Sequence, residues 1–272
     1  MNYTIHLHVD YNLTMLQKVA PTTSISLPLY VQISELLTRE IAAGHWVDGD
    51  RLPPEAELAS TLNVAVGTLR KALSELDSRG LLERRQGSGT YVKPKLPAQL
   101  LAKNAPRDKS IYEFFRLELV RGGGLPTAAV IDFQKIAKPD FCPDFASSAI
   151  QFKPHAQASC YRVRRLRSLN SIPVAIEEIY FDARHAPQLM LEDIGEALYL
   201  FYQQRLGFWI SHTEDRIGAG AVPDWAPAMF APKAGQVCPR IERISWSGKN
   251  TVEEYSITWT DPERCRYVNR LK

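Results

Sequence analysis

Apolar residues recur at helical spacing near the start of the chain. Within residues 29–43 they occupy positions that one helix face brings together, namely Ile33, Leu36, Leu37 and Ile41. This pattern predicts a helix over 29–43 that ends at Gly44, because glycine readily adopts the left-handed conformation of a helix end. Residues 1–24 lack such a period, and we expect them to form an N-terminal extension.

Two shorter helices are predicted next. Pro53 and Pro54 begin the first, because proline costs little in a first helical turn, and Leu58 and Leu62 are its apolar face. The second covers residues 66–79 and ends at Gly80. Its apolar stripe consists of Leu69, Ala72, Leu73 and Leu76. Its opposite face carries small and basic residues, namely Gly67, Lys71, Ser74 and Ser78, with Arg70 on the flank.

A hairpin follows these helices. Residues 81–85 and 90–93 have the pattern of short strands, and the glycine-rich turn 86–89 separates them. Two helices, a short turn, a third helix and a hairpin make up a winged helix-turn-helix, in which one helix enters the major groove of DNA. We therefore expect residues 25–93 to bind double-stranded DNA. The alternative is a winged helix that contacts only other proteins.

Charge is unevenly distributed and supports the DNA-binding interpretation. The whole chain has a net charge of only +3. Residues 25–69 hold two basic and six acidic residues, whereas residues 70–109 hold ten basic and four acidic residues. A basic patch on one segment is typical of nucleic-acid binding, although charge runs also occur in plain solvated segments. The residues expected to contact DNA are Arg51, Gly67, Thr68, Arg70, Lys71, Arg84, Arg85, Gln86 and Gly87.

The remaining chain alternates apolar and polar residues more than it follows a helical period. Prolines in residues 94–110 indicate a linker, and residues 111–272 are long enough for one further domain. We predict strands at 161–169, 174–181, 211–219, 238–245 and 253–260, a turn at 170–173, and a helix at 195–207. Antiparallel strands mixed with helices indicate an α+β domain.

One predicted strand carries the clearest chemistry of this domain. Arg165 and Arg167 share one face, because side chains alternate along a strand. Two guanidiniums on one face can bind a phosphate or a carboxylate with paired hydrogen bonds. Glu177 and Glu178 lie on the partner strand, so ordinary cross-strand ion pairs are the alternative. A slip of one residue in the hairpin would exchange the two faces, so the sequence leaves the pairing open.

Membrane, disulfide and metal chemistry are not indicated. No stretch approaches the roughly 18 apolar residues of a membrane span, and the first 25 residues lack the apolar run of a signal peptide. The widely spaced cysteines favour reduced thiols in a cytoplasm. They are Cys142, Cys160, Cys238 and Cys265. We expect a cytoplasmic protein without a cofactor, a metal ion or a membrane partner.

Three motifs in the N-terminal part resemble the GntR family of transcriptional regulators. Residues 52–59, LPPEAELA, resemble the family's LPSERELA signature, and residues 67–73, GTLRKAL, resemble its recognition helix. Residues 80–92, GLLERRQGSGTYV, resemble its wing. The chain departs from the family at Ala56, where an arginine is common, and at Ala65 and Val66, where a Ser-Arg pair is common. Since both family arginines are implicated in DNA contacts, the resemblance implies a larger role for Arg70, Lys71 and the wing.

The C-terminal part resembles the UTRA ligand domain of the HutC-type branch, more loosely than the three motifs resemble their family. The resemblance implies a chorismate-lyase-like fold, an antiparallel sheet with helices. The similar segments are residues 163–167, 173–178, 197–199 and 253–256. Carried over by position, the effector-binding residues are Arg165, Arg167, Glu177, Tyr199 and Glu254. Several sugar-phosphate-binding members have a serine where this chain has Ala197, which leaves a carboxylate effector open.

The sequence therefore predicts a dimeric repressor that a small anionic metabolite, a sugar phosphate or a carboxylate, releases from an inverted-repeat operator. The alternative is a chorismate-lyase-like enzyme domain fused to a DNA-binding module. No Ser/His/Asp or Cys/His arrangement stands out, and His155, His185 and His212 are isolated, so no catalytic residue is assigned. An all-helical metal-binding effector domain is a third possibility, which the alternating strands oppose.

Overall fold

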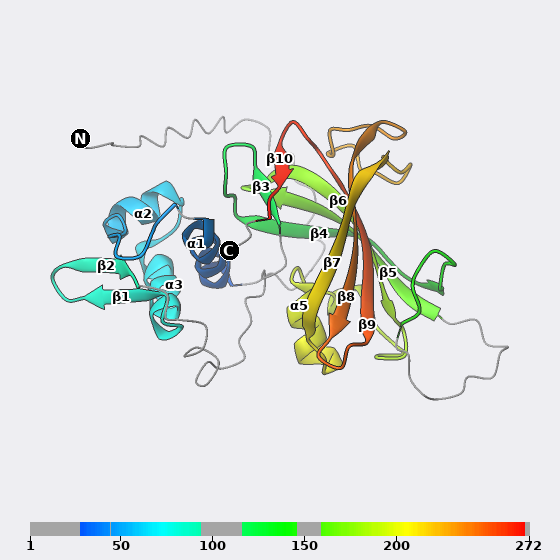
Figure 1. Cartoon of the computed structure of the whole chain (residues 1–272), viewed down its shortest axis with the longest axis horizontal. Helices are drawn as coiled ribbons and strands as arrows, with labels where there is room; N and C mark the ends of the chain where they lie inside the picture. The colour runs from blue at the N-terminus through cyan, green and yellow to red at the C-terminus, as the bar shows by residue number, and fades with distance from the viewer. Residues whose placement is uncertain (1–27, 44, 94–115, 146–158, 270–272) are drawn as a thin grey trace.

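The computed structural model describes residues 28–43, 45–93, 116–145 and 159–269 (Figure 1). The predicted extension 1–24, the predicted helix end at Gly44 and the predicted linker 94–110 lie outside these residues. The described elements form an N-terminal unit of helices with a hairpin and a C-terminal unit built on a sheet. The domain limits 25–93 and 111–272 stay predictions.

The N-terminal unit has the predicted order of elements. Helix α1 spans Leu29–Ala43, α2 spans Glu55–Thr61 and α3 spans Val66–Ser78. Strands β1 (Leu82–Arg85) and β2 (Gly89–Val92) pair antiparallel as a hairpin. The predicted winged helix-turn-helix is therefore confirmed, with boundaries that differ by one or two residues.

The apolar stripe of α3 fixes the orientation of that helix. Its four residues, Leu69, Ala72, Leu73 and Leu76, are at most 1% exposed. They pack against Ile33, Leu37 and the rest of one core cluster. Burying each leucine contributes about 1.5–3 kcal/mol, so this stripe holds the face with Gly67 and Arg70 outward.

A six-stranded antiparallel sheet forms the C-terminal unit, in the order β4-β5-β6-β9-β8-β7. Its strands are β4 (Pro126–Ala137), β5 (Ser159–Leu169), β6 (Ile172–Asp182), β7 (Ile210–Ala221), β8 (Val237–Ser247) and β9 (Val252–Thr260). Strands β3 (Leu117–Leu119) and β10 (Cys265–Tyr267) pair as a small second sheet. The predicted α+β class is confirmed, but β3, β4 and β10 were not predicted from the sequence. β3 and β10, with three residues each, are too short to show a period.

Other segments pack against both faces of the large sheet. Helix α5 (Leu198–Phe201) and the π-helical turn η2 (Tyr202–Leu206) pack on one face, where Figure 1 shows α5 beside the sheet. The other face is covered by a segment that includes Val222 and Phe230. A short 3₁₀ turn, η1 (Leu191–Asp193), precedes α5. No helix in the described ranges is long and apolar enough to cross a bilayer.

Two local predictions are corrected. The hairpin turn is not 170–173 but only Asn170 and Ser171, whose φ angles are 50° and 63°. Positive φ at both positions gives the turn whose twist matches antiparallel strands. Pro173 therefore lies inside β6, beside a register shift of the ladder, where a missing N–H is tolerated. The predicted helix 195–207 begins only at Leu198, because Ala197 has non-helical angles, and it ends at Gly207 with φ 75°.

Candidate nucleic-acid interface and candidate ligand pocket

The outward face of α3 is small and basic, as the sequence predicts. Gly67, Arg70 and Lys71 are exposed, and Thr68 is half-buried in the first turn. The Lys71 ammonium lies 3.9 Å from the centre of the Tyr30 ring of α1, a cation–π contact that holds the amine beside the helix. Ala65 caps α3 without a side-chain hydrogen bond, so the cap that a serine would supply is absent.

A groove runs between the hairpin and the start of α2. It has a volume of about 510 Å³ and is lined by residues 51–55 and 84–90. Five predicted DNA-contacting residues line it, namely Arg51, Arg84, Arg85, Gln86 and Gly87. Three arginines therefore gather at one groove, and guanidiniums are well suited to phosphate and base-edge contacts.

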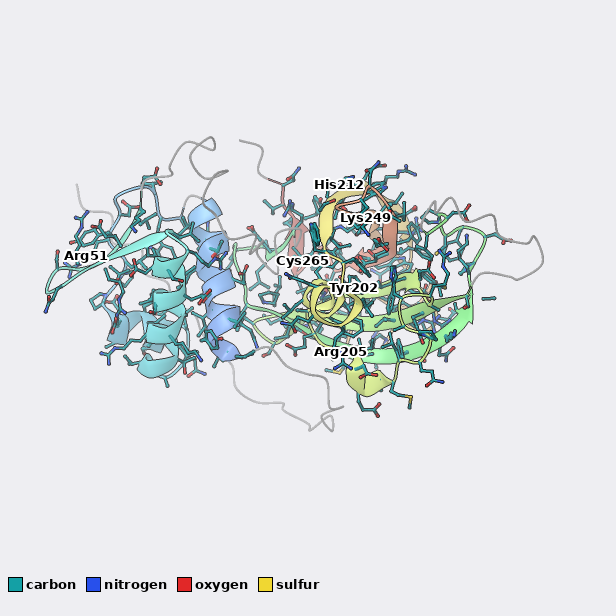
Figure 2. All side chains as sticks on the ribbon, turned by 90° about the horizontal axis from the view of Figure 1, so that it is seen from below. Arg51, Tyr202, Arg205, His212, Lys249 and Cys265 are labelled. Carbon is teal, nitrogen blue, oxygen red and sulfur yellow. The ribbon has the colours of Figure 1, made fainter. Side chains whose placement is uncertain are left out.

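Backbone geometry places Arg51 at this groove. Arg51 pairs with Tyr91 of β2 through an isolated bridge, and Figure 2 shows it beside the hairpin. Gly89 has φ 123°, and a Cβ there would lie 2.8 Å from Nε of Arg51. The positive φ favours glycine at this position, and a side chain there would also displace the Arg51 guanidinium.

Contacts hold the wing arginines in defined positions. Nη2 of Arg85 donates to Glu83 at 2.9 Å, and the Arg85 guanidinium lies 4.4 Å from the centre of the Tyr91 ring. Nη2 of Arg84 donates to Oε1 of Glu55 at 2.7 Å. These contacts favour defined positions for Arg84 and Arg85, while both side chains stay at the surface.

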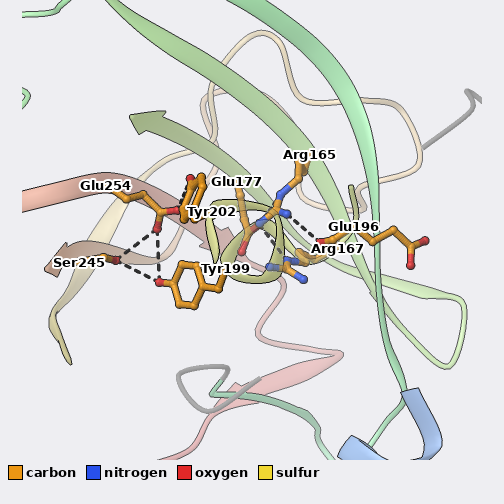
Figure 3. A network of polar contacts seen from close by, with 8 residues as sticks. All are labelled: Arg165, Arg167, Glu177, Glu196, Tyr199, Tyr202, Ser245 and Glu254. Carbon is orange, nitrogen blue, oxygen red and sulfur yellow. Dashed lines mark hydrogen bonds and ion pairs between the residues drawn. The ribbon is translucent and has the colours of Figure 1, made fainter. Parts of the chain in front are cut away.

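The C-terminal unit has a pocket at the centre of its sheet. All five predicted effector residues line it, namely Arg165, Arg167, Glu177, Tyr199 and Glu254. They come from β5, β6, α5 and β9, and Figure 3 shows them in two groups of polar contacts, one around Glu177 and the other around Glu254. The free volume is about 80 Å³, room for a few water molecules, so a larger molecule needs the lining to move.

Two arginines share one carboxylate oxygen at the first end of the pocket. The register pairs Arg165 with Glu177, which settles the pairing that the sequence left open. Oε2 of Glu177 accepts from Nε and Nη2 of Arg165 at 3.1 and 2.7 Å, and from Nε of Arg167 at 2.8 Å. Nη1 of Arg165 donates to the backbone oxygen of Glu196 at 3.0 Å.

The carboxylate of this cluster is held in its charged form. Burial alone would raise the pKa of Glu177, but Arg167 and Arg165 hold it below its ordinary value, so the carboxylate stays ionised. Two guanidiniums converge on this one carboxylate oxygen. An anion is the natural complement of such a site.

Hydroxyl groups surround a buried carboxyl at the other end of the pocket. The hydroxyl of Tyr202 donates to Oε2 of Glu254 at 2.7 Å, and the hydroxyl of Tyr199 lies 3.0 Å from Oγ of Ser245. Burial raises the pKa of Glu254 above its ordinary value. Ala197 lies in the lining without a hydroxyl, so this position supplies no hydrogen-bond donor where a serine would.

Some lining residues were missed by the sequence analysis. Ser256 and Thr258 follow Glu254 at every second position of β9, so strand alternation alone could have found them. Arg243 of β8 also lines the pocket and donates to Asp215 at 2.6 and 2.7 Å. Arg116 precedes β3 in a segment where no strand was predicted, and no sequence signal marks it.

Neither the cysteines nor grouped metal-ligating side chains indicate a further site in the described residues. All four cysteines are buried and unpaired, and burial raises the pKa of Cys142 to about 12. No group of three or more metal-ligating side chains occurs in the part of the chain that the structure describes.

A winged helix with a basic outer face, joined to a sheet domain with an arginine-lined pocket, defines a DNA-binding transcription regulator with a ligand domain. The sequence comparisons agree with this class. Residues 29–92 match the model of the bacterial regulatory proteins of the gntR family, and residues 124–266 match the UTRA domain. The chain belongs to the GntR family, in its UTRA-containing branch.

Curated relatives are regulators as well. The chain is 47% identical over 250 residues to the HTH-type transcriptional regulator SmoD of Agrobacterium fabrum, covering 92% of this chain and 99% of the relative. It is 27% identical to the histidine utilization repressor of Pseudomonas aeruginosa, over 83% and 84% of the two chains. It is also 27% identical to the transcriptional repressor NagR of Bacillus subtilis, over 90% and 95%. The chain is therefore a transcriptional regulator and not an enzyme.

Solved structures give distant matches. The possible transcriptional regulator YydK of Bacillus subtilis is 19% identical, with a TM-score of 0.46, over 89% of this chain and 99% of that one. The family assignment rests on the sequence comparisons.

Proposed function

We propose that this regulator is a dimeric repressor that acts in the cytoplasm, and that a small anionic metabolite releases it from an inverted-repeat operator. The observation that carries the proposal is the pair of arginines on β5 that face a single carboxylate, Glu177. Two guanidiniums side by side, in a pocket that hydroxyl groups line at the other end, favour a sugar phosphate or a carboxylate bearing hydroxyl groups.

Release from DNA follows if the ligand favours one arrangement of the molecule. A ligand shifts an equilibrium only by its differential affinity for the two states. The small free volume of the pocket supports such a difference, because a molecule larger than a few waters requires the lining to rearrange. In a dimer, that movement would change the separation of the two recognition helices and weaken the fit to two half-sites.

The relatives' names are compatible with this role. Histidine utilization and transport or metabolism of mannosyl-D-glycerate appear in the names of repressors to which the chain is similar. Such names point to small nutrients and their derivatives as the compounds to test first.

The experiment uses the full-length protein. A thermal-shift screen with sugar phosphates and small carboxylates identifies stabilising compounds, and fluorescence anisotropy then measures their effect on operator binding. Arg167→Met removes one cluster arginine, and Arg164→Met removes an arginine of the same strand that pairs with Glu178 instead. We expect an active anion to weaken DNA binding at least tenfold in the wild type and in the Arg164→Met variant, but not in the Arg167→Met variant.

The deeply buried arginine gives a second test. Arg165→Ala is expected to abolish the effector response while leaving DNA binding intact, and loss of both together would assign Arg165 a structural role. An uncharged compound that releases DNA equally well from the wild type and from Arg167→Met would contradict the anionic effector. Turnover of the bound compound would contradict a sensor.

A further inference from the structure

One carboxylate joins the recognition helix to the wing. Glu55, at the first position of α2, accepts a hydrogen bond from Nε of Arg70 on α3 at 2.6 Å with its Oε2. Its Oε1 accepts from Nη2 of Arg84 on β1 at 2.7 Å. Two arginines expected to read DNA, which lie on different elements, are therefore held by the two oxygens of one side chain.

The backbone that leads into Glu55 is conformationally restricted. It follows Pro53 and Pro54, whose rings fix the backbone, and Pro54 caps α2 with φ −50° and ψ 141°. The side chain of Glu55 is 26% exposed, whereas that of Arg70 is 63% exposed. The carboxylate thus lies below the arginines and leaves them at the surface.

Charge at the groove depends on the same residue. Among the described residues that line the groove, Arg51, Arg84 and Arg85 are basic and Glu55 is the only acid. The hydrogen bond from Arg70 is the largest influence that holds the pKa of Glu55 below its ordinary value, so the carboxylate is ionised at neutral pH. Glu55 therefore removes part of the positive charge that this groove would otherwise offer to any DNA.

We propose that Glu55 is a positioning residue that sets the selectivity of DNA recognition, by holding Arg70 and Arg84 in place and lowering the attraction of the groove for DNA of any sequence. Non-specific affinity comes from the number of phosphates that cations neutralise, and it needs no fixed geometry. Base readout needs a guanidinium held in one orientation. Two arginines held by Glu55 therefore favour base readout over non-specific phosphate contacts.

This role is separate from the effector pocket and does not depend on dimer formation. It concerns only the DNA-binding unit, and its test needs no effector. The preferred DNA is first obtained by selection from random sequences with the wild-type protein. Binding to that DNA and to a scrambled version is then measured by fluorescence anisotropy at several NaCl concentrations.

The test compares Glu55→Gln with Glu57→Gln in the full-length protein. Both substitutions remove one negative charge from α2, and Glu57 is exposed. We expect Glu55→Gln to lower the ratio of selected to scrambled affinity by about tenfold, the equivalent of one base contact. On scrambled DNA its log–log salt slope should steepen by up to about 0.9 for each phosphate that a released arginine reaches. Glu57→Gln should leave the ratio unchanged.

Melting temperature separates positioning from folding. Because the contacts of Glu55 are near the surface, Glu55→Gln should melt within a few degrees of the wild type. An unchanged ratio in Glu55→Gln, or an equal loss of ratio in Glu57→Gln, overturns the proposal. A large drop in melting temperature with equal loss of both affinities also overturns it, because it assigns Glu55 to the fold alone.

Discussion

Glutamates that each hold two arginines occur at both candidate sites, but with different burial. The side chain of Glu55 is 26% exposed, whereas that of Glu177 is 11% exposed and its partner Arg165 only 3%. Exposed ion pairs contribute about 0–1 kcal/mol, while removing one partner of a buried pair costs about 3–5 kcal/mol. The same kind of contact therefore contributes little to stability at Glu55 and more at Glu177.

The exposed arginine of α3 gives the first prediction. Arg70→Ala should lower affinity for the selected DNA by at least about tenfold, because a well-placed guanidinium contributes about 1–3 kcal/mol of base discrimination. Fluorescence anisotropy measures the change. Arg216→Ala, which removes an exposed arginine from β7, is the control and should bind DNA like the wild type. Unchanged affinity in Arg70→Ala would contradict the assigned recognition face.

The buried carboxyl of Glu254 gives a prediction about pH. Its pKa is raised from 4.5 by burial, so the folded state holds the proton more tightly than the unfolded state. Its stabilising contribution is complete below pH 4.5 and is lost as the pH rises through the raised pKa. Glu254→Gln should remove this loss of stability with rising pH. Urea unfolding at several pH values, followed by tryptophan fluorescence, measures the free energy of unfolding of both proteins.

Glu177 should change the stability with pH in the opposite direction, and it serves as the control. Its pKa is lowered by Arg167 and Arg165 against the effect of burial, so its contribution is present above pH 4.5 and is lost as the pH falls through the lowered pKa. Glu177→Gln should therefore weaken the loss of stability at acidic pH. If both variants kept the pH dependence of the wild type, the network would not control it.

At the scale of elements, the β5–β6 hairpin places the pocket residues. Its turn requires positive φ at Asn170 and Ser171, and the resulting register sets Arg165 opposite Glu177. Asparagine accepts such angles more readily than serine does. The turn therefore requires Ser171 to adopt a backbone conformation that serine disfavours.

This strain predicts a stabilising substitution. Ser171→Gly should raise the free energy of unfolding by about 0.5–1 kcal/mol, because glycine has no Cβ to oppose φ 63°. Ser168→Gly, in the extended β5 strand, should destabilise by a similar amount. Urea unfolding followed by tryptophan fluorescence measures both. Equal effects of the two substitutions would show that the turn carries no strain.

At the scale of the whole molecule, the proposed dimer makes a geometric prediction. Two recognition helices in a dimer read half-sites about one turn of DNA apart, 10–10.5 base pairs. Inserting five base pairs between the half-sites of the selected DNA turns one of them to the opposite side of the duplex. We expect at least a tenfold loss of affinity in a mobility-shift assay. An insertion of ten base pairs returns the two half-sites to the same side of the duplex and should recover part of the lost affinity.

The oligomeric state is measured in parallel. Light scattering of the full-length protein should give twice the 30.7 kDa mass of one chain. A monomer that binds with the same affinity whatever the spacing would contradict the dimeric mode.

Much of the N-terminal unit could be predicted from local signals. Helical spacing of apolar residues predicted the helices at 29–43 and 66–79, and the structure places their ends within one residue of those limits. Pro53 and Pro54 marked the start of the second helix, which begins at Glu55. The C-terminal unit was less predictable. Strand β4 begins at a proline and contains small alanines, so its alternation is weak, and the sequence analysis missed it.

By itself, the sequence determined the elements of the N-terminal unit and the face of α3 that turns outward, because the apolar residues that recur at helical spacing are the ones that become buried. It also supplied the five pocket residues through their resemblance to a family. Only the tertiary structure decided their pairing. The partner of Arg165 depends on a turn two residues long, and the contacts of Glu55 join residues that lie 15 and 29 positions away in the chain. Such contacts arise from packing between elements, which no local pattern encodes.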